Sequence, residues 1–563
     1  MKKIIIVVFI VCVSNAFGFQ DADSITYNIS AVIKDSVPML KIQATFSANN
    51  TGVSKFYYPN SRWGEENLQN CLINLAAIGN NKALQITREN DTIIITHSKK
   101  LKSITMDYLL KQDKGTGYDF DYSYRPVIQE SYFHVFSANL FVRPTLEKST
   151  TIKIFWKDLS ESYKVFNSFG SNQKTQIIKN SSLDDFGAGV FVGGDYKIHQ
   201  LSARNKNVSL ATLGQWNFLD EKTIVNILNE TVNGLDKFWE EKSNDFFAVV
   251  LSTVKVNYIG NVSIAGGTGL HQSFDAYCTD NSYTSMDSLV SLFNHELNHQ
   301  WIGLKITNEN EEEQYWFSEG FTTYYTAKLV AKNAINQMDS SFFIKEMNRI
   351  IEEHYASKAK NIPNSAITTE TFWGNPDYEK IPYNRGALFA FYLDQKIQKE
   401  SNSKLGLDDV MREILREATA SGQKLTHPYF IKTVNRFLNE DIQSDFKRYI
   451  EDGDLLPLER FFKEYQLEFM VTFSKLKPMG LSYDDGQDGR ISTVVENSDA
   501  EHAGFMVGDI ITAFEENPKP GQKATYTVKR GEKLMEISLI RKERLIDIPQ
   551  LKDNDHKMQI LQF

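Results

Sequence analysis

Two histidines in this chain have the spacing of ligands to a single metal ion. They belong to the segment His295-Glu296-Leu297-Asn298-His299, in a stretch of helical periodicity that begins near Ser285. Residues i and i+4 of a helix lie on one face, so both imidazoles can reach one ion. Glu296 points to one side, where it can take a proton from a water at the metal without binding the metal. The pattern predicts a catalytic zinc site, which has three protein ligands and leaves a position for water.

A carboxylate further along the chain completes the predicted site. The segment Trp316-Phe-Ser-Glu319-Gly320 places Glu319 at the start of a helix expected over 319–333. We therefore assign His295, His299 and Glu319 as zinc ligands. An acidic run between the two segments is the alternative source of the third ligand, but it lies in a polar, loop-like stretch of the kind that usually forms a solvated face. Its members are Glu309, Glu311, Glu312 and Glu313.

Two other segments could serve the same chemistry. Tyr383, in Tyr383-Asn-Arg-Gly-Ala387, could donate its phenol to the oxyanion that forms when a peptide carbonyl is attacked. Gly266, Gly267 and Gly269 form a glycine-rich turn that lets backbone approach closely, so an extended peptide could pair with the strand edge beside it. Ordinary packing of the tyrosine and a plain tight turn are the simpler interpretations.

With these motifs in place, the chain resembles the glycyl-aminopeptidase family of zinc peptidases, which are relatives of thermolysin. The resemblance implies a β-rich N-terminal domain, a thermolysin-like and mainly helical catalytic domain, and a C-terminal PDZ domain. It also implies Zn²⁺ at His295, His299 and Glu319, with Glu296 as general base and Tyr383 as transition-state stabiliser. The matching segments are Ser131-Tyr132-Phe133, Leu140-Phe141, Gly266-Gly267, His295 to Trp301, Trp316 to Gly320, Tyr383 to Ala387, and Leu393-Asp394.

One departure from the family concerns the end of the peptide substrate. The family's glycine turn usually continues Leu-Glu-His, and in related aminopeptidases a glutamate from this region holds the substrate's ammonium. Here the turn continues Gly269-Leu270-His271-Gln272-Ser273, with no carboxylate before Asp275. A buried ammonium needs a compensating charge. We expect a peptidase, most readily an aminopeptidase, with an endopeptidase of the same mechanism as the alternative. Arg385 stands where the family often has Lys, which keeps the positive charge.

The periodicity of the chain predicts a multidomain α+β fold. Residues 22–170 alternate with period two, as in Leu40, Ile42, Ala44 and Phe46, which is typical of strands. Later segments have helical periodicity, and the break at 452–457 marks a domain boundary. The expected domains are a signal peptide at 1–18, a β-rich domain at 19–175, a zinc peptidase domain at 176–455, a linker and PDZ domain at 456–546, and a tail at 547–563. Helices are expected near 221–239 and at 285–303, 319–333, 341–357, 385–400 and 407–419.

The C-terminal part carries a possible binding loop for peptides. Met479, Gly480 and Leu481 resemble the carboxylate-binding loop of PDZ domains, whose backbone N–H groups hold the terminal carboxylate of a peptide. A domain that only packs against the catalytic unit is the simpler interpretation. A second class of function follows from this part: a non-catalytic scaffold in which zinc is structural. A structural zinc normally has a fourth protein ligand, and the sequence offers no obvious candidate.

Composition narrows the remaining possibilities. The 563 residues include 62 Lys+Arg and 71 Asp+Glu, and the net charge of −9 argues against a nucleic-acid partner. Lys2-Lys3, the apolar run 4–13 and small residues up to Gly18 predict a cleaved signal peptide and hence a periplasmic or extracellular protein with no transmembrane anchor. Of three cysteines, Cys71 and Cys278 remain after cleavage, and the sequence does not tell whether they pair.

Overall fold

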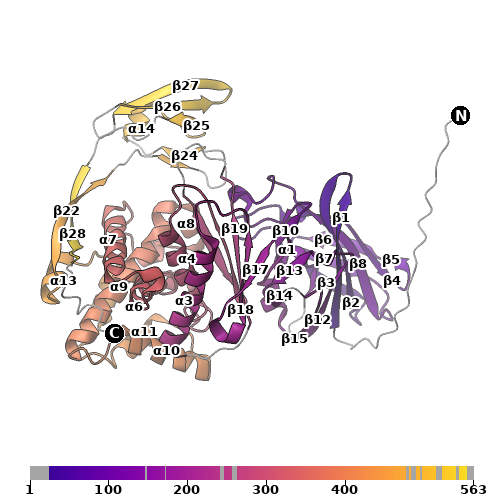
Figure 1. Cartoon of the computed structure of the whole chain (residues 1–563), viewed down its shortest axis with the longest axis horizontal. Coiled ribbons are helices and arrows are strands. Elements are labelled where there is room, and N and C mark those ends of the chain that lie inside the picture. Colours follow the sequence, from indigo (N-terminus) through magenta and orange to yellow (C-terminus); the bar gives the residue numbers. More distant parts are fainter. Residues whose placement is uncertain are drawn as a thin grey trace.

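A computed structural model describes most of the chain. The described residues are 24–145, 149–171, 173–240, 246–256, 263–476, 481–483, 490–494, 498–514, 523–540 and 544–553. The predicted signal peptide, and Met479 and Gly480 of the predicted carboxylate loop, lie outside them. Figure 1 shows a β-rich part that contains the N-terminal strands, a helical part beside it, and a small β-rich module above the helical part.

The N-terminal domain is built from three sheets around one apolar core. The period-two pattern is confirmed, since Leu40, Ile42, Ala44 and Phe46 are all buried on one face of β2. The largest sheet runs in the order β15 (Thr175–Ser181), β12 (Thr150–Lys157), β1 (Ser24–Lys34), β2 (Val37–Ser47), β8 (Ser103–Lys111), β4 (Leu72–Gly79) and β5 (Lys82–Ala83). The second is β11 (Arg143–Pro144), β3 (Val53–Tyr57), β7 (Thr92–Thr96) and β6 (Gln85–Glu89).

The third sheet carries the N-terminal domain past its expected end at 175. It consists of β14 (Gly170–Ser171), β13 (Lys164–Asn167), β16 (Val190–Gly194), β10 (Tyr132–Phe136) and β9 (Val127–Ile128), with the short helices α1 (Ser137–Leu140) and α2 (Leu183–Gly187) nearby in the chain. Because β16 pairs with both β10 and β13, the domain continues to Gly194.

A mixed five-stranded sheet opens the helical part of the molecule. Its order is β17 (Lys197–Gln200), β18 (Val208–Leu213), β19 (Phe247–Thr253), β21 (Ser273–Cys278) and β20 (Ala265–Leu270). Strands β18, β19 and β21 are parallel, whereas β20 is an antiparallel edge strand. The predicted helix near 221 is confirmed as α3 (Glu221–Trp239), which begins at an Asp220 side-chain cap and buries Ile224, Leu228, Val232, Leu235 and Trp239.

Ten further helices form the rest of this part (Figure 1); nine of them share one apolar core with the sheet, and Phe372 of the tenth, α8, packs in a smaller cluster with Ile367 and Ile381. The predicted helices exist with shifted ends: 285–303 stops at residue 298, and 385–400 begins nine residues earlier because Pro376 occupies the first turn. The helices are α4 (Met286–Asn298), α5 (Glu311–Ser318), α6 (Gly320–Lys332), α7 (Ser340–Ala356), α8 (Thr369–Gly374), α9 (Pro376–Glu400), α10 (Leu407–Ser421), α11 (His427–Val434), α12 (Gln443–Phe446) and α13 (Leu458–Glu464).

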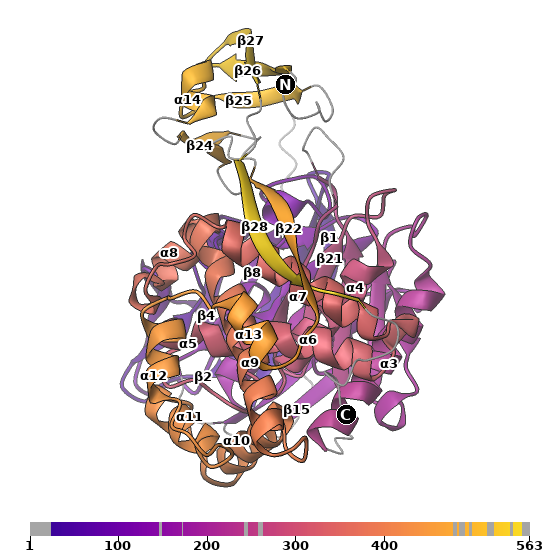
Figure 2. The ribbon, with the colours of Figure 1, turned by 90° about the vertical axis from the view of Figure 1, so that its left-hand side faces the viewer.

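The C-terminal module stands apart on a two-stranded ribbon (Figure 2). The ribbon pairs β22 (Phe469–Leu476) with β28 (Arg544–Leu551), so the tail expected from 547 begins inside a strand. Beyond the ribbon lie β23 (Leu481–Tyr483), β24 (Ile491–Val494), α14 (Asp499–Ala503), β25 (Ile510–Phe514), β26 (Lys523–Arg530) and β27 (Lys533–Ile540). A small core that includes Ile491, Phe505 and Tyr526 holds this module together.

Two questions left by the sequence concern cysteines and membranes. Cys71 and Cys278 are both free and buried, one in each of the two large domains, so they do not pair. Within the described residues, no helix has the length and apolar character that crossing a membrane would require.

Candidate metal centre and active-site cavity

Helix α4 positions the first two predicted ligands. Ser285 caps its N-terminus by accepting a hydrogen bond from the Ser288 N–H, and Leu289, Phe293 and Leu297 bury one face in the core. The helix ends at residue 298, but His299 keeps a helical backbone (φ −61°, ψ −14°). The i, i+4 relation is therefore preserved, and His295 and His299 project to the same side.

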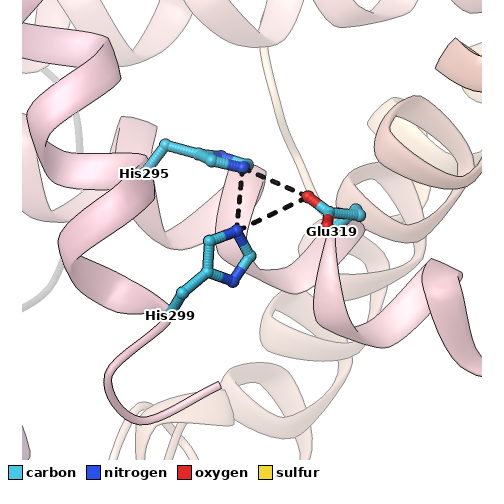
Figure 3. A group of neighbouring side chains, drawn as sticks. All are labelled: His295, His299 and Glu319. Atoms are coloured by element: carbon cyan, nitrogen blue, oxygen red, sulfur yellow. Dashed lines mark hydrogen bonds and ion pairs between the residues drawn. The ribbon is translucent and has the colours of Figure 1, made fainter. Parts of the chain in front are cut away.

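The third ligand comes from the junction of α5 and α6. Figure 3 shows the Glu319 carboxylate pointing at both imidazoles. Glu319 Oε2 lies 3.2 Å from His295 Nε2 and 3.6 Å from His299 Nε2, and the two nitrogens are 3.2 Å apart. Ligand atoms placed 2.0–2.1 Å from a tetrahedral ion would lie about 3.3–3.4 Å from one another. The donor atoms of these three residues thus fit one zinc ion.

Three residues of the acidic run, Glu311, Glu312 and Glu313, form the first turn of a helix rather than a loop, whereas Glu309 precedes the helix in a bend. Helix α5 begins at Glu311, and the carboxylates of Glu311, Glu312 and Glu313 lie where the helix dipole favours negative charge. Glu311 accepts a hydrogen bond from Ser318, and Glu312 accepts one from the Thr369 N–H. Among the described residues, the group able to hold a metal is His295, His299 and Glu319.

Contacts around the ligands orient them. The His299 Nδ1–H donates to the Ile302 carbonyl at 3.1 Å, which leaves Nε2 to face the site. Burial lowers the pKa of His299, but the Glu319 carboxylate outweighs this effect and raises it to about 9. Burial opposes ionisation of Glu319, yet the two imidazoles hold its pKa well below the usual value. The site therefore favours an anionic Glu319 carboxylate.

Glu296 lies beside the ligands without joining them. It lines the same cavity as His295, as expected for a base one residue from a ligand. Burial raises the pKa of Glu296 above the usual carboxyl value, although the neighbouring imidazoles partly offset this. A carboxylate with a raised pKa is suited to taking up a proton and releasing it again.

Tyr383 reaches the same site from α9. Its ring stacks on the His295 ring at a centroid distance of 5.8 Å, and Lys380 lies 5.0 Å from its ring centre. Burial, together with the charge of Glu319, raises the pKa of Tyr383 well above its usual value. The phenol is therefore protonated and can act as a hydrogen-bond donor.

A crossing of two glycines sets the position of Tyr383 relative to Glu319. A Cβ at Gly386 would lie 1.9 Å from the Trp316 carbonyl oxygen and 2.8 Å from the Gly320 Cα. Gly320 follows Glu319, and Gly386 lies one helical turn after Tyr383. The backbones of α6 and α9 thus touch beside the third ligand, which brings the phenol to the metal site.

His295, Glu296 and Tyr383 line a cavity of about 640 Å³. The glycine segment that the sequence predicted as a turn is instead the edge strand β20, which lies along one wall. Gly266 and Gly267 are needed there because a Cβ would approach Tyr277 and the Asp275 carbonyl within 2.7 Å. A Cβ at Gly269 would meet only His299, at 3.9 Å. The sheet order leaves the outer edge of β20 unpaired by the described strands, as backbone pairing with a peptide requires.

Several lining residues were missed by the sequence analysis. Trp63 and Tyr124 come from the N-terminal domain, and Trp373 comes from α8. Trp373 is 67% exposed, which is unusual for so large an apolar side chain. No motif marks these aromatic residues, and Trp63 and Tyr124 reach the cavity only through the packing of the two domains.

Comparison with known proteins finds a family model that covers the three residues of this site. Residues 272–449 match the model of the Peptidase family M1 domain. Leucine aminopeptidase 2 of Ajellomyces capsulatus is 25% identical over 139 residues, which are 24% of this chain and 22% of that protein. Leukotriene A-4 hydrolase of Xenopus laevis is 26% identical over 111 residues, 19% of this chain and 18% of that one. The matched stretch thus spans about a fifth of these relatives.

The likeness in fold extends over nearly the whole chain. An aminopeptidase N family protein from Idiomarina loihiensis has a TM-score of 0.73 at 17% identity and covers 95% of this chain and 100% of its own. The match to the Peptidase family M1 model thus covers residues 272–449, and the likeness to the Idiomarina loihiensis protein, at 17% identity, shows a shared fold.

Proposed function

We propose that the protein hydrolyses peptide bonds with a zinc ion held by His295, His299 and Glu319. The observation that carries this proposal is the convergence of their three donor atoms, 3.2–3.6 Å apart, beside Glu296 in a cavity walled by an edge strand. Zinc held there would supply Lewis acidity, which polarises a carbonyl and lowers the pKa of a water.

The side chains around the ligands account for the remaining steps. Glu296 takes the proton of the attacking water and passes it to the departing amine. The protonated phenol of Tyr383 donates a hydrogen bond to the oxyanion. The backbone of β20 pairs with the peptide and holds the scissile bond in place. Each role uses a group that the fold already places around one cavity.

The first test is the variant Glu296→Gln. We expect peptide hydrolysis to fall by about 10²–10⁴-fold, because amide nitrogen cannot accept the proton. Zinc content, measured by atomic absorption, should stay near one ion per chain because Glu296 is not a ligand. The matched control is Glu312→Gln, a carboxylate outside the cavity, which should keep full activity. A zinc-loaded Glu296→Gln protein with wild-type activity would contradict the role of the base.

We infer that the cut removes residues from the N-terminus of a peptide. Relatives named as aminopeptidases support this, and the resemblance to glycyl-aminopeptidases agrees with it. The charges of the cavity support it too, because Glu346 and Glu353 share the single Arg349 and leave a negative charge to attract a substrate's ammonium. Cleavage within a peptide by the same mechanism is the alternative, and comparing matched peptides with free and acetylated N-termini tests it.

Two further features extend the proposal beyond catalysis. The predicted signal peptide at 1–18 supports export to the periplasm or the extracellular space. The small β-rich C-terminal module, with Leu481 starting β23, supports a PDZ domain that binds the C-terminus of a peptide or protein. Mass spectrometry of the N-terminus of secreted protein tests the first, and titration of C-terminal peptides with free or amidated ends tests the second.

A further inference from the structure

We propose that Trp63 and Tyr124 form a subsite that receives a large apolar side chain next to the scissile bond, and that the buried Arg125 positions both aromatic rings. The proposal rests on the proposed peptidase function and names the class of peptide that the site prefers. Both rings line the cavity that contains Glu296, yet they belong to the N-terminal domain. The domain that carries none of the predicted zinc ligands therefore selects the substrate.

Trp63 has a backbone conformation that a large side chain rarely adopts. Two backbone hydrogen bonds between Arg62 and Glu65, of 3.0 and 2.9 Å, close a turn whose central residues are Trp63 and Gly64. Trp63 has a φ of 50° and Gly64 a φ of 78°, so both lie in the left-handed region that suits glycine. Strain of this kind persists where surrounding contacts fix it, and it is concentrated at functional sites. The place that the turn gives to the ring accounts for a tryptophan here.

The Trp63 ring is held by packing and presents part of its surface to the cavity. Its ring centre lies 4.7 Å from that of Phe136 and 5.7 Å from that of Tyr124. The guanidinium carbon of Arg62 lies 4.2 Å from the same ring centre. Because Phe136 is fully buried, it gives the ring a fixed support. Trp63 itself is only half-buried and lines the cavity, as a binding surface must.

Tyr124 connects this ring to the strand that is proposed to hold the peptide. Its hydroxyl donates a hydrogen bond of 3.4 Å to the Gly267 carbonyl of β20. Its ring lies edge-on to the ring of Tyr277, at a centroid distance of 6.5 Å. Burial, then the neighbouring Tyr277 and the charge of Glu296, raises the pKa of Tyr124 well above its usual value, so the phenol lies near the base. A peptide that pairs with β20 and is cut beside Glu296 therefore carries a side chain past these rings.

The chemistry of this wall decides which side chain it favours. Strand β20 contributes Gly266, Gly267 and Thr268, which add no charge. An apolar side chain gains free energy by leaving water for a surface of aromatic rings, and an aromatic side chain can also stack. A basic side chain at Trp63 would meet the Arg62 guanidinium that already lies on that ring, and like charges repel. We thus expect phenylalanine and leucine to be favoured over lysine, and over alanine, which is too short to cover the rings.

Arg125 ties the two aromatic residues together from inside the N-terminal domain. It follows Tyr124 in the chain and is 1% exposed. Its guanidinium lies 3.0 Å from Glu65 Oε2 and 2.7 Å from Asp113 Oδ2. Since Glu65 closes the turn that carries Trp63, one buried group holds both that turn and the backbone next to Tyr124. The planar fork of arginine bonds two carboxylates at once in a way that lysine cannot copy. Arg125 is therefore a positioning residue and does not itself touch the substrate.

The first test compares peptides that differ only in their N-terminal residue, which is phenylalanine, leucine, alanine or lysine. We expect the zinc-loaded wild type to cleave the phenylalanine and leucine peptides with kcat/KM about tenfold above that of the alanine peptide. Trp63→Ala should lower this ratio to about twofold, because the ring surface is lost. Phe218→Ala is the matched control, since Phe218 is 61% exposed and lies outside the cavity lining, and it should keep the wild-type ratio.

The outcomes separate this inference from the proposed function. A wild-type ratio in the folded Trp63→Ala protein overturns the subsite and leaves the peptidase function standing. A wild type that prefers the alanine or the lysine peptide does the same. If the zinc-loaded wild type cleaves none of the four peptides at any bond, the proposed function itself fails.

The second test reaches Arg125 through its partner, because Glu65→Gln keeps the size of the side chain and removes the charge. We expect KM for the phenylalanine peptide to rise about fivefold while kcat falls by less than about twofold, since the ring shifts and the metal site does not. KM for the alanine peptide should rise by less than about twofold, whereas a merely structural loss would lower kcat for both peptides alike. Arg125→Lys, which keeps the charge but not the fork, should act in the same direction.

The matched control for the positioning role is Glu66→Gln. Glu66 meets Arg125 through its backbone carbonyl, at 2.7 Å, so loss of its side-chain charge should leave KM for both peptides at the wild-type value. Wild-type KM for the phenylalanine peptide in both the Glu65→Gln and the Arg125→Lys proteins would contradict the positioning role of Arg125.

Discussion

At the scale of single residues, the site depends on how each donor is held rather than on the donors alone. His295 and His299 come from the end of α4, and Glu319 comes from the junction of α5 and α6. The backbone carbonyl of Ile302 fixes which nitrogen of His299 faces the site. The geometry says most about the position of Tyr383. Its stacking on His295 places the phenol next to a ligand, where a carbonyl oxygen would be attacked.

The variant Tyr383→Phe tests that role. We expect kcat to fall by about 10²–10³-fold, the usual cost of removing one oxyanion donor, with little change in KM. Zinc content should be unchanged, because the ring still fills its place against His295. Tyr378→Phe, on the same helix but outside the cavity lining, should retain wild-type kcat. A rise in KM with unchanged kcat would show that Tyr383 only shapes the pocket.

The sequence was sufficient to predict the three residues that the fold brings together, His295, His299 and Glu319, but not the residues around them. The i, i+4 histidines and the base are local features of one helix, so spacing alone predicts them. Trp63 and Tyr124 reach the cavity only because the N-terminal domain packs against β20 and β21, a relation between distant segments that no local pattern encodes.

At the scale of elements, glycines show why composition can mislead. Glycine-rich segments are usually turns, and the sequence predicts a turn over 266–269 for that reason. In the fold, Gly266 and Gly267 are required by Tyr277 and by the Asp275 carbonyl on the neighbouring strand β21. Close approach of side chain and backbone, not a reversal of the chain, explains them. The N-terminal strands were easier to predict, because the alternation of apolar and polar residues directly indicates that one face of each strand is buried.

The contact between α6 and α9 yields a prediction at this scale. Gly386→Ala puts a Cβ 1.9 Å from the Trp316 carbonyl oxygen of α5 and 2.8 Å from the Gly320 Cα of α6, so α9 must move away from both helices. We expect a loss of about 1–3 kcal/mol in the free energy of unfolding, measured by urea denaturation. We also expect kcat to fall more than KM rises, because Tyr383 moves away from Glu319. Gly374→Ala, where a Cβ meets nothing within 4 Å, should change stability by less than about 0.5 kcal/mol. Equal stability of the two variants would rule out the glycine crossing as a positioning contact.

At the scale of the whole molecule, helix α7 connects the catalytic cavity to the C-terminal module. One side of α7 supplies Glu346, Arg349 and Glu353 to the cavity rim. Another side holds the ribbon, because Asn348 donates to the Leu551 carbonyl at 2.9 Å and accepts from the Leu551 N–H at 2.8 Å. Figure 2 shows the ribbon rising from this helix to the module. Only the folded chain reveals this connection, since Asn348 and Leu551 are about 200 residues apart.

The anchoring role of Asn348 can be measured directly. Asn348→Ala removes both hydrogen bonds to Leu551 and leaves two backbone groups of β28 without their partner, at a cost of about 1–3 kcal/mol. Hydrogen exchange should therefore speed up in β28 and β22, while α4 and α6 keep their protection. Cleavage of a short peptide should change by less than about twofold, because the cavity residues of α7 stay on their helix. Lys345→Ala, a side chain 65% exposed on the same helix, is the matched control and should leave exchange unaltered. Unchanged exchange in the ribbon of the Asn348→Ala protein would mean that apolar packing of β28 on α7, rather than this side chain, anchors the module.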